Sequence, residues 1–206
     1  MGIIDCLLAV TKPPLQLPRA ILFDMDGTLT CPMLDFPKIR AEMGIGDRPI
    51  LEALADLDES RRSLAQNVLL DHEERASRES NLNPGCAELI AWLIDRSIAI
   101  ALVTRNSTAS TRVVLKRHQL RIDVAITRDD GVFEPSPQPL LLACEKLNIP
   151  PQDAWMVGDG QYDIEAGIAA GMTTVWIDHD RPRQFDAAPS VTVRDLPQLH
   201  ALLREI

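Results

Sequence analysis

Short apolar runs bounded by turn residues recur along the chain from residue 20 onward. Runs of this length, with no alternation of polar and apolar side chains, are typical of strands that are buried on both faces of a parallel sheet. The sequence therefore predicts five strands, which lie at residues 20–23, 98–103, 124–127, 154–157 and 173–177.

Segments with apolar residues at helical spacing follow these predicted strands. Strand and helix thus alternate along the chain, which is the pattern of a parallel sheet with right-handed crossovers. The expected fold class is α/β, with a Rossmann-like parallel five-stranded sheet and helices on both faces. The predicted helices of this core lie at residues 86–96, 108–118, 139–147, 164–170 and 196–203.

The segment between the first predicted strand and residue 83 has a different pattern. Its charges are dense, strand-like runs are absent, and Leu and Ala recur at helical spacing over residues 35–81. Asp58 is a suitable helix start. We expect two or three helices, which form a small α-helical cap at residues 31–82 inserted after the first strand. The core domain then comprises residues 1–30 and 83–206.

Composition and charge limit the classes of partner. The 206 residues carry a net charge of -9, and 46% of them are hydrophobic and 25% charged, which is ordinary for a globular protein. The acidic balance argues against nucleic acid or an anionic membrane as a partner, since such a footprint needs clustered Lys and Arg. A small phosphorylated substrate stays compatible, because one site needs only local positive charge or a metal.

The sequence shows no signal for export or membrane insertion. No apolar run approaches the ~18 residues of a membrane span. The start of the chain, an irregular lead-in at residues 1–18, has no basic region typical of a signal peptide. The four cysteines form no Cys-x-x-Cys pair and are expected as free thiols in a reducing cytosol. The four histidines show no ligand spacing and are expected at the surface. A cytoplasmic location is therefore predicted.

Polar clusters follow four of the predicted strands. In an open parallel sheet, ligands bind beyond the carboxyl ends of the strands, so these clusters are expected to converge at one edge. That edge is the predicted functional site. The clusters are Asp24 with Asp26, Thr104 with Asn106, the segment from Arg128 to Glu134, and Asp159 with Asp163.

Asp24 and Asp26 follow the first predicted strand, and they can take two different roles in phosphoryl transfer. A carboxylate such as that of Asp24 can attack phosphorus and form an aspartyl-phosphate, which water then hydrolyses. Asp26 can protonate the leaving group and then deprotonate the water. Gly27 lets the backbone approach the phosphoryl oxygens, and Thr104 at a helix start can donate to them.

A carboxylate and a phosphate repel each other, and a hard cation between them offsets this repulsion. Mg²⁺ takes about six oxygen ligands, several of them waters. Asp159 ends another predicted strand and can join Asp24 on the metal. Asp163 can hold a metal-bound water or orient Asp159. The sequence therefore predicts a Mg²⁺ site.

The motifs resemble those of the haloacid dehalogenase superfamily of Mg²⁺-dependent phosphohydrolases. They are Asp24-x-Asp26-Gly27-Thr28, then Thr104, then Gly158-Asp159-x-x-x-Asp163. The resemblance covers about residues 19–178, and the helical insertion is similar to the small cap of that family. It implies that Asp24 is nucleophile and metal ligand, and that Asp26 is acid and base and gives its backbone carbonyl to the metal. It also implies that Thr104 binds phosphate and that Asp159 binds the metal with support from Asp163.

Glu134 departs from the family pattern. Members usually carry a Lys at this point, often within Lys-Pro-x-Pro, and that Lys offsets charge between nucleophile and phosphate. Three interpretations are open. Another cation substitutes, with Arg128 best placed and Arg105 next. Alternatively, Glu134 points outward while Mg²⁺ supplies most of the stabilisation, or the protein is a catalytically weak binding or regulatory protein.

The sequence thus predicts a phosphoric monoester hydrolase that uses Mg²⁺ and acts on a small phosphorylated metabolite. Family members that cleave carbon–halogen bonds lack the second Asp and the metal, so Asp26 favours phosphoryl chemistry. A phosphotransferase or mutase on the same fold is the alternative. The predicted site comprises catalytic Asp24 and Asp26, phosphate-binding Gly27, Thr104, Arg105, Asn106 and Arg128, and the metal ligands Asp24, Asp26, Asp159 and Asp163.

Overall fold

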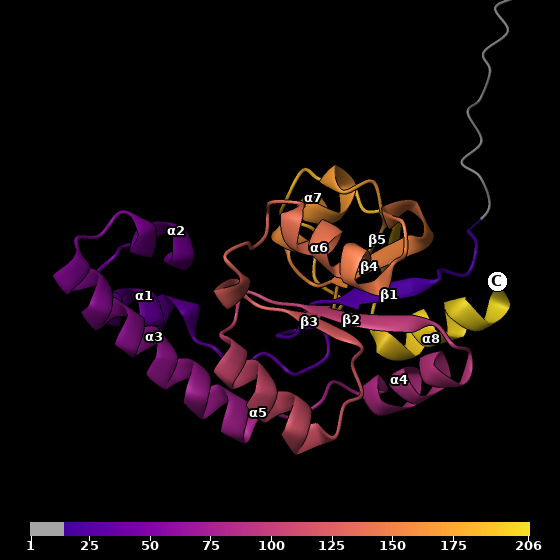
Figure 1. Cartoon of the computed structure of the whole chain (residues 1–206), viewed down its shortest axis with the longest axis horizontal. Coiled ribbons are helices and arrows are strands. Elements are labelled where there is room, and N and C mark those ends of the chain that lie inside the picture. The colour runs from indigo at the N-terminus through magenta and orange to yellow at the C-terminus, as the bar shows by residue number, and fades with distance from the viewer. Residues whose placement is uncertain (1–14) are drawn as a thin grey trace, which may run out of the picture.

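The structure of the protein, a computed structural model, describes residues 15–206 and contains one parallel sheet. Of the predicted irregular lead-in at residues 1–18, residues 1–14 lie outside the described part of the chain. Figure 1 shows the sheet between helices, with a further group of helices set to one side as a cap. The strands pair in the order β3-β2-β1-β4-β5-β6. They are β1 (Ala20–Phe23), β2 (Ala99–Val103), β3 (Val124–Ile126), β4 (Ala154–Gly158), β5 (Thr173–Ile177) and β6 (Val191–Val193).

The sheet has six strands rather than the five that the sequence predicts, and the additional strand is β6. This strand has three residues and pairs with β5 at the edge of the sheet. Its central residue, Thr192, is exposed. A strand this short at an edge lacks the continuous apolar run by which buried strands are recognised, so the pattern gave no signal for it.

Helices cover both faces of the sheet (Figure 1). The helices of the core domain are α4 (Cys86–Asp95), α5 (Thr108–His118), α6 (Gln138–Leu147), α7 (Gln161–Ala169) and α8 (Leu196–Glu205), with short 3₁₀ turns at Arg128–Asp130 and Pro151–Asp153. Ile21 and Phe23 of β1 share an apolar layer with α4, α5 and α8. Ala20 and Leu22 share the opposite layer with α6 and α7. Among the described residues, no helix combines the length and apolarity needed to cross a membrane.

The cap consists of three helices with an apolar cluster of their own. Ile39, Leu54 and Leu69, one from each helix, are buried in this cluster. Asp35 and Asp58 stand at the N-termini of the first and third helices, where each carboxylate accepts a backbone N–H at 3.0 Å. The helix start that the sequence predicts at Asp58 is therefore confirmed. The cap helices are α1 (Phe36–Met43), α2 (Ile50–Ala55) and α3 (Glu59–Glu79).

Two adjacent chain segments connect the cap to the core. The backbone N–H of Cys31 donates to the carbonyl of Asn81, and the N–H of Asn83 donates to the carbonyl of Leu29, both at 2.9 Å. Helix α3 also packs against α5 of the core, and the two lie side by side in Figure 1. The cap is thus inserted after β1 and returns beside the same strand end.

Candidate active site

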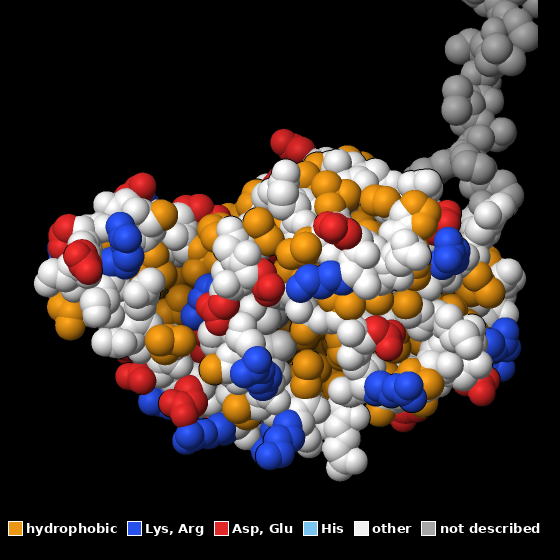
Figure 2. Space-filling view, viewed as in Figure 1, with side chains coloured by type: hydrophobic (Ala, Val, Ile, Leu, Met, Phe, Trp, Pro, Cys, Tyr) orange, Lys and Arg blue, Asp and Glu red, His pale blue; other side chains and the backbone are white. Residues whose placement is uncertain are grey.

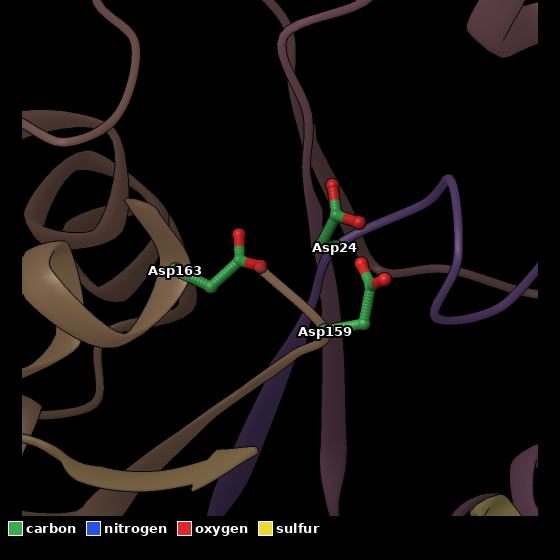
Figure 3. A group of neighbouring side chains, drawn as sticks. All are labelled: Asp24, Asp159 and Asp163. Atoms are coloured by element: carbon green, nitrogen blue, oxygen red, sulfur yellow. The ribbon is translucent and has the colours of Figure 1, made fainter. Parts of the chain in front are cut away.

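Three carboxylates meet at the carboxyl edge of the sheet (Figure 3). Asp24 follows β1, Asp159 follows β4, and Asp163 lies in the first turn of α7. One oxygen from each carboxylate lies within 4.8 Å of the others. Strands β1 and β4 are neighbours, with Phe23 in register with Val157, so their ends lie together. The structure thus brings together three of the four predicted metal ligands.

Two glycines leave the space that these carboxylates occupy. A Cβ atom on Gly27, where φ is +90°, would lie 2.5 Å from a carboxylate oxygen of Asp159. A Cβ atom on Gly158 would overlap the carboxylate of Asp163. A side chain at either position would therefore displace the cluster. The sequence interpretation has Gly27 making room for a phosphate, whereas in the structure the group beside it is the Asp159 carboxylate.

Neighbouring residues hold Asp159 and Asp163 in place. The indole N–H of Trp176 donates to the backbone oxygen of Asp159 at 3.0 Å, and the N–H of Gly160 donates to the Asp163 carboxylate at 2.9 Å. Arg181 forms an ion pair with Asp159 at 2.9 Å. Sequence reasoning missed Arg181, because it lies in a loop after β5 and belongs to no motif.

The loop that follows Asp24 is fastened by the side chain of Asn83. Its amide donates to the carbonyl oxygens of Gly27, Thr28 and Thr30 at 3.0, 2.8 and 3.1 Å. A ring nitrogen of His179, a residue expected at the surface, lies 2.7 Å from the same Gly27 oxygen. Sequence reasoning missed both contacts, since Asn83 precedes Pro and Gly and therefore indicates only a turn.

The carboxylate of Asp26 belongs to a hydrogen-bonded group beside the cluster. It accepts from the amide of Asn106 and, at 3.4 Å, from the hydroxyl of Thr30. The hydroxyl of Thr104 accepts from the backbone and the side-chain N–H groups of Asn106, each at 3.2 Å. Burial raises the pKa of Asp26, and the hydrogen bond from Asn106 lowers it in part. The structure therefore places Asp26, Thr104 and Asn106 together.

The crowding of carboxylates alters their titration. Burial, followed by the charges of Asp163 and Asp159, holds the pKa of Asp24 well above its usual range. Burial and then the charge of Glu134 do the same to the pKa of Asp163. A cation among these groups would offset the repulsion, and carboxylate oxygens are the ligands that hard cations such as Mg²⁺ prefer. The residues present therefore fit a divalent cation.

Glu134 lies in the wall of the cavity above the cluster. Its side chain is 2% exposed, and neither carboxylate oxygen has a hydrogen-bond partner. Burial raises its pKa. The interpretation in which Glu134 points outward is therefore excluded. When ionised, this carboxylate acts on Asp24 and Asp163 and adds to the negative charge of the site.

Arg105 and Arg128, the two cations considered as substitutes for the family Lys, occupy different places. Arg105 lines the cavity, where its guanidinium contacts both carboxylate oxygens of Glu52 at 2.9 Å. Arg128 pairs with the buried Glu73 of the cap at 3.0 Å and does not line the cavity. The structure thus reverses the expected order, because Arg105 reaches the cavity and Arg128 is held by the cap.

A cavity of about 480 Å³ lies between the cap and the acidic cluster. Figure 2 shows the cap as a lobe beside the core, with hydrophobic side chains along the hollow between them. A volume of this size suits a small molecule. The apolar side chains that the cap contributes to the wall are Leu34, Phe36, Pro49, Ile50, Leu51 and Leu69.

The fold and the site together define the class of protein. The sheet is parallel, an acidic cluster lies at its strand ends beneath an inserted helical cap, and this edge is where open α/β folds bind their ligands. The profile of the haloacid dehalogenase-like hydrolases matches residues 33–171, and the chain belongs to this family. The resemblance drawn from the motifs is confirmed.

Similar proteins span nearly the whole chain. A haloacid dehalogenase-like hydrolase domain-containing protein of Arabidopsis thaliana is 31% identical over 205 residues, which cover 90% of this chain and 83% of the relative. A phosphoglycolate phosphatase of Nitrosococcus oceani is 28% identical and covers 93% of this chain and 99% of its own. The crystal structure of a hydrolase from Pseudomonas syringae has a TM-score of 0.76 at 20% identity, over 91% of this chain and 98% of that one. The last comparison supports the fold.

Proposed function

We propose that the protein is a cytosolic, Mg²⁺-dependent hydrolase of small phosphate monoesters that works through an aspartyl-phosphate. The observation that carries the proposal is the cluster of Asp24, Asp159 and Asp163, with Asp26 beside it, at the floor of a cavity under the cap. The name of the phosphatase relative supports the reaction class. The free cysteines among the described residues suit a reducing compartment.

Asp24 is the proposed nucleophile. One of its carboxylate oxygens attacks phosphorus, so that a bond forms from Asp24 to phosphorus and the bond from phosphorus to the leaving oxygen breaks. Asp159 and Asp163 would hold Mg²⁺ together with Asp24. The bound cation supplies positive charge that offsets the repulsion between carboxylate and phosphate. Thr104, which is linked to Asp26 through the Asn106 amide, is the proposed donor to a phosphoryl oxygen.

Asp26 is the proposed acid and base. Its raised pKa favours the protonated form, from which it gives a proton to the leaving oxygen. The resulting carboxylate then takes a proton from water, whose oxygen attacks phosphorus while the bond to Asp24 breaks. Inorganic phosphate leaves, and both carboxyl groups return to their starting states. Thr30 and Asn106 orient the Asp26 carboxylate for both transfers.

Glu134 favours a second candidate function, which is a catalytically weak binding or regulatory protein. Its buried and unpartnered carboxylate stands where the family usually carries a Lys. A negative charge at that point would repel both Asp24 and a phosphate, and at ~4 Å with an effective dielectric of ~20 one such term is worth about 4 kcal/mol. Arg105 offsets part of this charge, although its guanidinium is also paired with Glu52.

Hydrolysis of p-nitrophenyl phosphate, with and without Mg²⁺, tests the proposal. Asp24→Asn keeps the shape of the side chain and removes the nucleophile, so we expect turnover to fall by roughly 10³-fold or more. Asp71→Asn, at an exposed position of the cap, is the matched control and should keep wild-type turnover. Absence of turnover over a broad panel of phosphate esters, with Mg²⁺ binding retained in calorimetry, would favour the binding protein.

A further inference from the structure

Arg40, on cap helix α1, is a guanidinium in the cavity wall without an anionic partner. It is half-buried, its Nε atom is buried, and no hydrogen-bond partner lies near that atom. No carboxylate of the described residues lies within ion-pair distance of it, including Asp47, which lines the same cavity. Buried polar groups in folded proteins nearly always have partners. Arg40 therefore has an unused capacity to bind an anion.

Arg105 provides the contrast within the same cavity. Its guanidinium contacts both oxygens of Glu52 and lies 4.7 Å from the centre of the Tyr162 ring. Its charge and its N–H groups are thus largely satisfied by the protein. Of the two arginines that line the cavity, Arg40 is the one that no carboxylate among the described residues neutralises.

Arg40 lines the cavity from the cap, and the acidic cluster lines it from the core. It belongs to the cap, whereas Asp24 and Asp163 belong to the edge of the sheet. The wall on the side of Arg40 is otherwise largely apolar. A phosphoryl group beside Asp24 and a group beside Arg40 would therefore be opposite ends of one small molecule.

We infer that Arg40 binds a second anionic group of the substrate, at the end remote from the phosphoryl group that is transferred. This inference rests on the proposed function and extends it to a substrate class. The substrate is a small phosphate monoester that also carries a carboxylate or a second phosphate, joined by a short chain that packs against the apolar wall. The planar guanidinium suits either anion, since it donates two parallel hydrogen bonds to both.

Matched substrates test the inference. We compare kcat/KM for carboxyalkyl phosphates of increasing chain length, for hydroxyalkyl phosphates of the same lengths and for alkane bisphosphates. The wild-type protein should prefer a compound with a second anion over its neutral counterpart. In Arg40→Met this preference should fall on the order of 10- to 100-fold, mainly through KM, because the loss on the anionic compounds should exceed any loss on the neutral ones by that factor. The anionic series with the higher kcat/KM identifies the second anionic group as a carboxylate or a phosphate.

Two further variants separate recognition from folding. Arg40→Lys keeps the charge and should restore part of the preference. Arg61→Met removes an exposed arginine of the same cap and should leave the preference unchanged. Thermal unfolding of each variant shows whether the cap is intact. Equal losses on anionic and neutral compounds in Arg40→Met, or a wild-type protein without preference, would overturn the inference.

A binding measurement distinguishes failure of this inference from failure of the proposed function. Calorimetry with phosphonoalkanoates and with neutral hydroxyalkyl phosphonates needs no turnover. The wild-type protein could hydrolyse no ester and still bind the phosphonoalkanoates more tightly than the hydroxyalkyl phosphonates. If Arg40→Met then removes this difference in affinity, the role of Arg40 is supported and the proposed hydrolase activity is not. If the two ligand series bind equally well, Arg40 does not recognise a second anion.

Discussion

Glu73 of cap helix α3 and Arg128 of the core form an ion pair that has little contact with water. Their side chains are 2% and 14% exposed, and Nη2 of Arg128 lies 3.0 Å from Oε2 of Glu73. Glu73 also accepts the backbone N–H of Ser107 at 3.3 Å. The pair therefore fastens the middle of α3 to the core close to the site. It also explains why Arg128 does not replace the missing Lys.

Loss of this pair should destabilise the protein. In Glu73→Ala, Arg128 would stay buried without its anionic partner, so we expect the free energy of unfolding to fall by about 3–5 kcal/mol in urea titrations. Glu74→Ala on the same helix is the control. It breaks the pair between Glu74 and Arg78, whose side chains are 56% and 69% exposed, respectively. Loss of this exposed pair should lower the free energy of unfolding by less than about 1 kcal/mol. Similar losses in both variants would contradict the role given to Glu73.

Metal affinity should depend on the absence of a side chain at Gly27. The new Cβ of Gly27→Ala would press on the Asp159 carboxylate, so we expect Mg²⁺ affinity in calorimetry to fall on the order of 10- to 100-fold. Gly131→Ala has a similar φ of +80° but no atom within 4 Å of the new Cβ. Gly131→Ala therefore introduces backbone strain without a steric contact, and it should bind Mg²⁺ with wild-type affinity. If Gly27→Ala also binds normally, Asp159 is not a ligand.

Replacement of Glu134 should raise turnover. Glu134→Lys turns a repulsive charge in the cavity wall into an attractive one for phosphate, and we expect a gain in kcat/KM on the order of 10²-fold. Glu134→Gln removes the negative charge alone and should give a smaller gain. Steady-state kinetics on one aryl phosphate measures both, with thermal unfolding to verify the fold. A large loss in both variants would show that the carboxylate has a role of its own.

Stability should fall below neutral pH in part through His118. Its ring lies 2.9 Å from the Ser80 hydroxyl, where α3 meets α5, and burial followed by the charge of Arg117 lowers its pKa below the ordinary 6.5. Such a group takes up a proton on unfolding. Its contribution is present above pH 6.5 and declines as the pH falls towards the lower folded value. His118→Gln should flatten this part of the profile in urea titrations between about pH 7.5 and about pH 5.5. An unchanged slope would exclude His118 as the source.

The sheet was predictable because strands buried on both faces leave an unbroken apolar run in the sequence. The positions of Asp24 and Asp159 followed from this, since parallel strands that are neighbours end at the same edge. Helix α7 begins at Gln161, ahead of the predicted residue 164, which puts Asp163 in its first turn. The edge strand β6 was not predictable, because its three residues make no such run.

The contacts that hold the site together were not predictable. Arg181 on Asp159, and Glu73 on Arg128, join residues that are far apart in sequence and belong to no motif. Their pairing depends on how a loop and the cap return to the core, and local patterns carry no information on that path. The burial of Glu134 was open for the same reason, since a single charged residue in a loop can point either way.

The Asn83 amide has a consequence for the construction of chimeras. Asn83 follows the last residue of the cap in sequence, yet its side chain closes on three carbonyl groups of the loop that carries Asp26. A cap taken from a relative must therefore be spliced before Asn83, so that this amide stays with its own loop. A graft that includes position 83 would exchange part of the catalytic scaffold together with the lid.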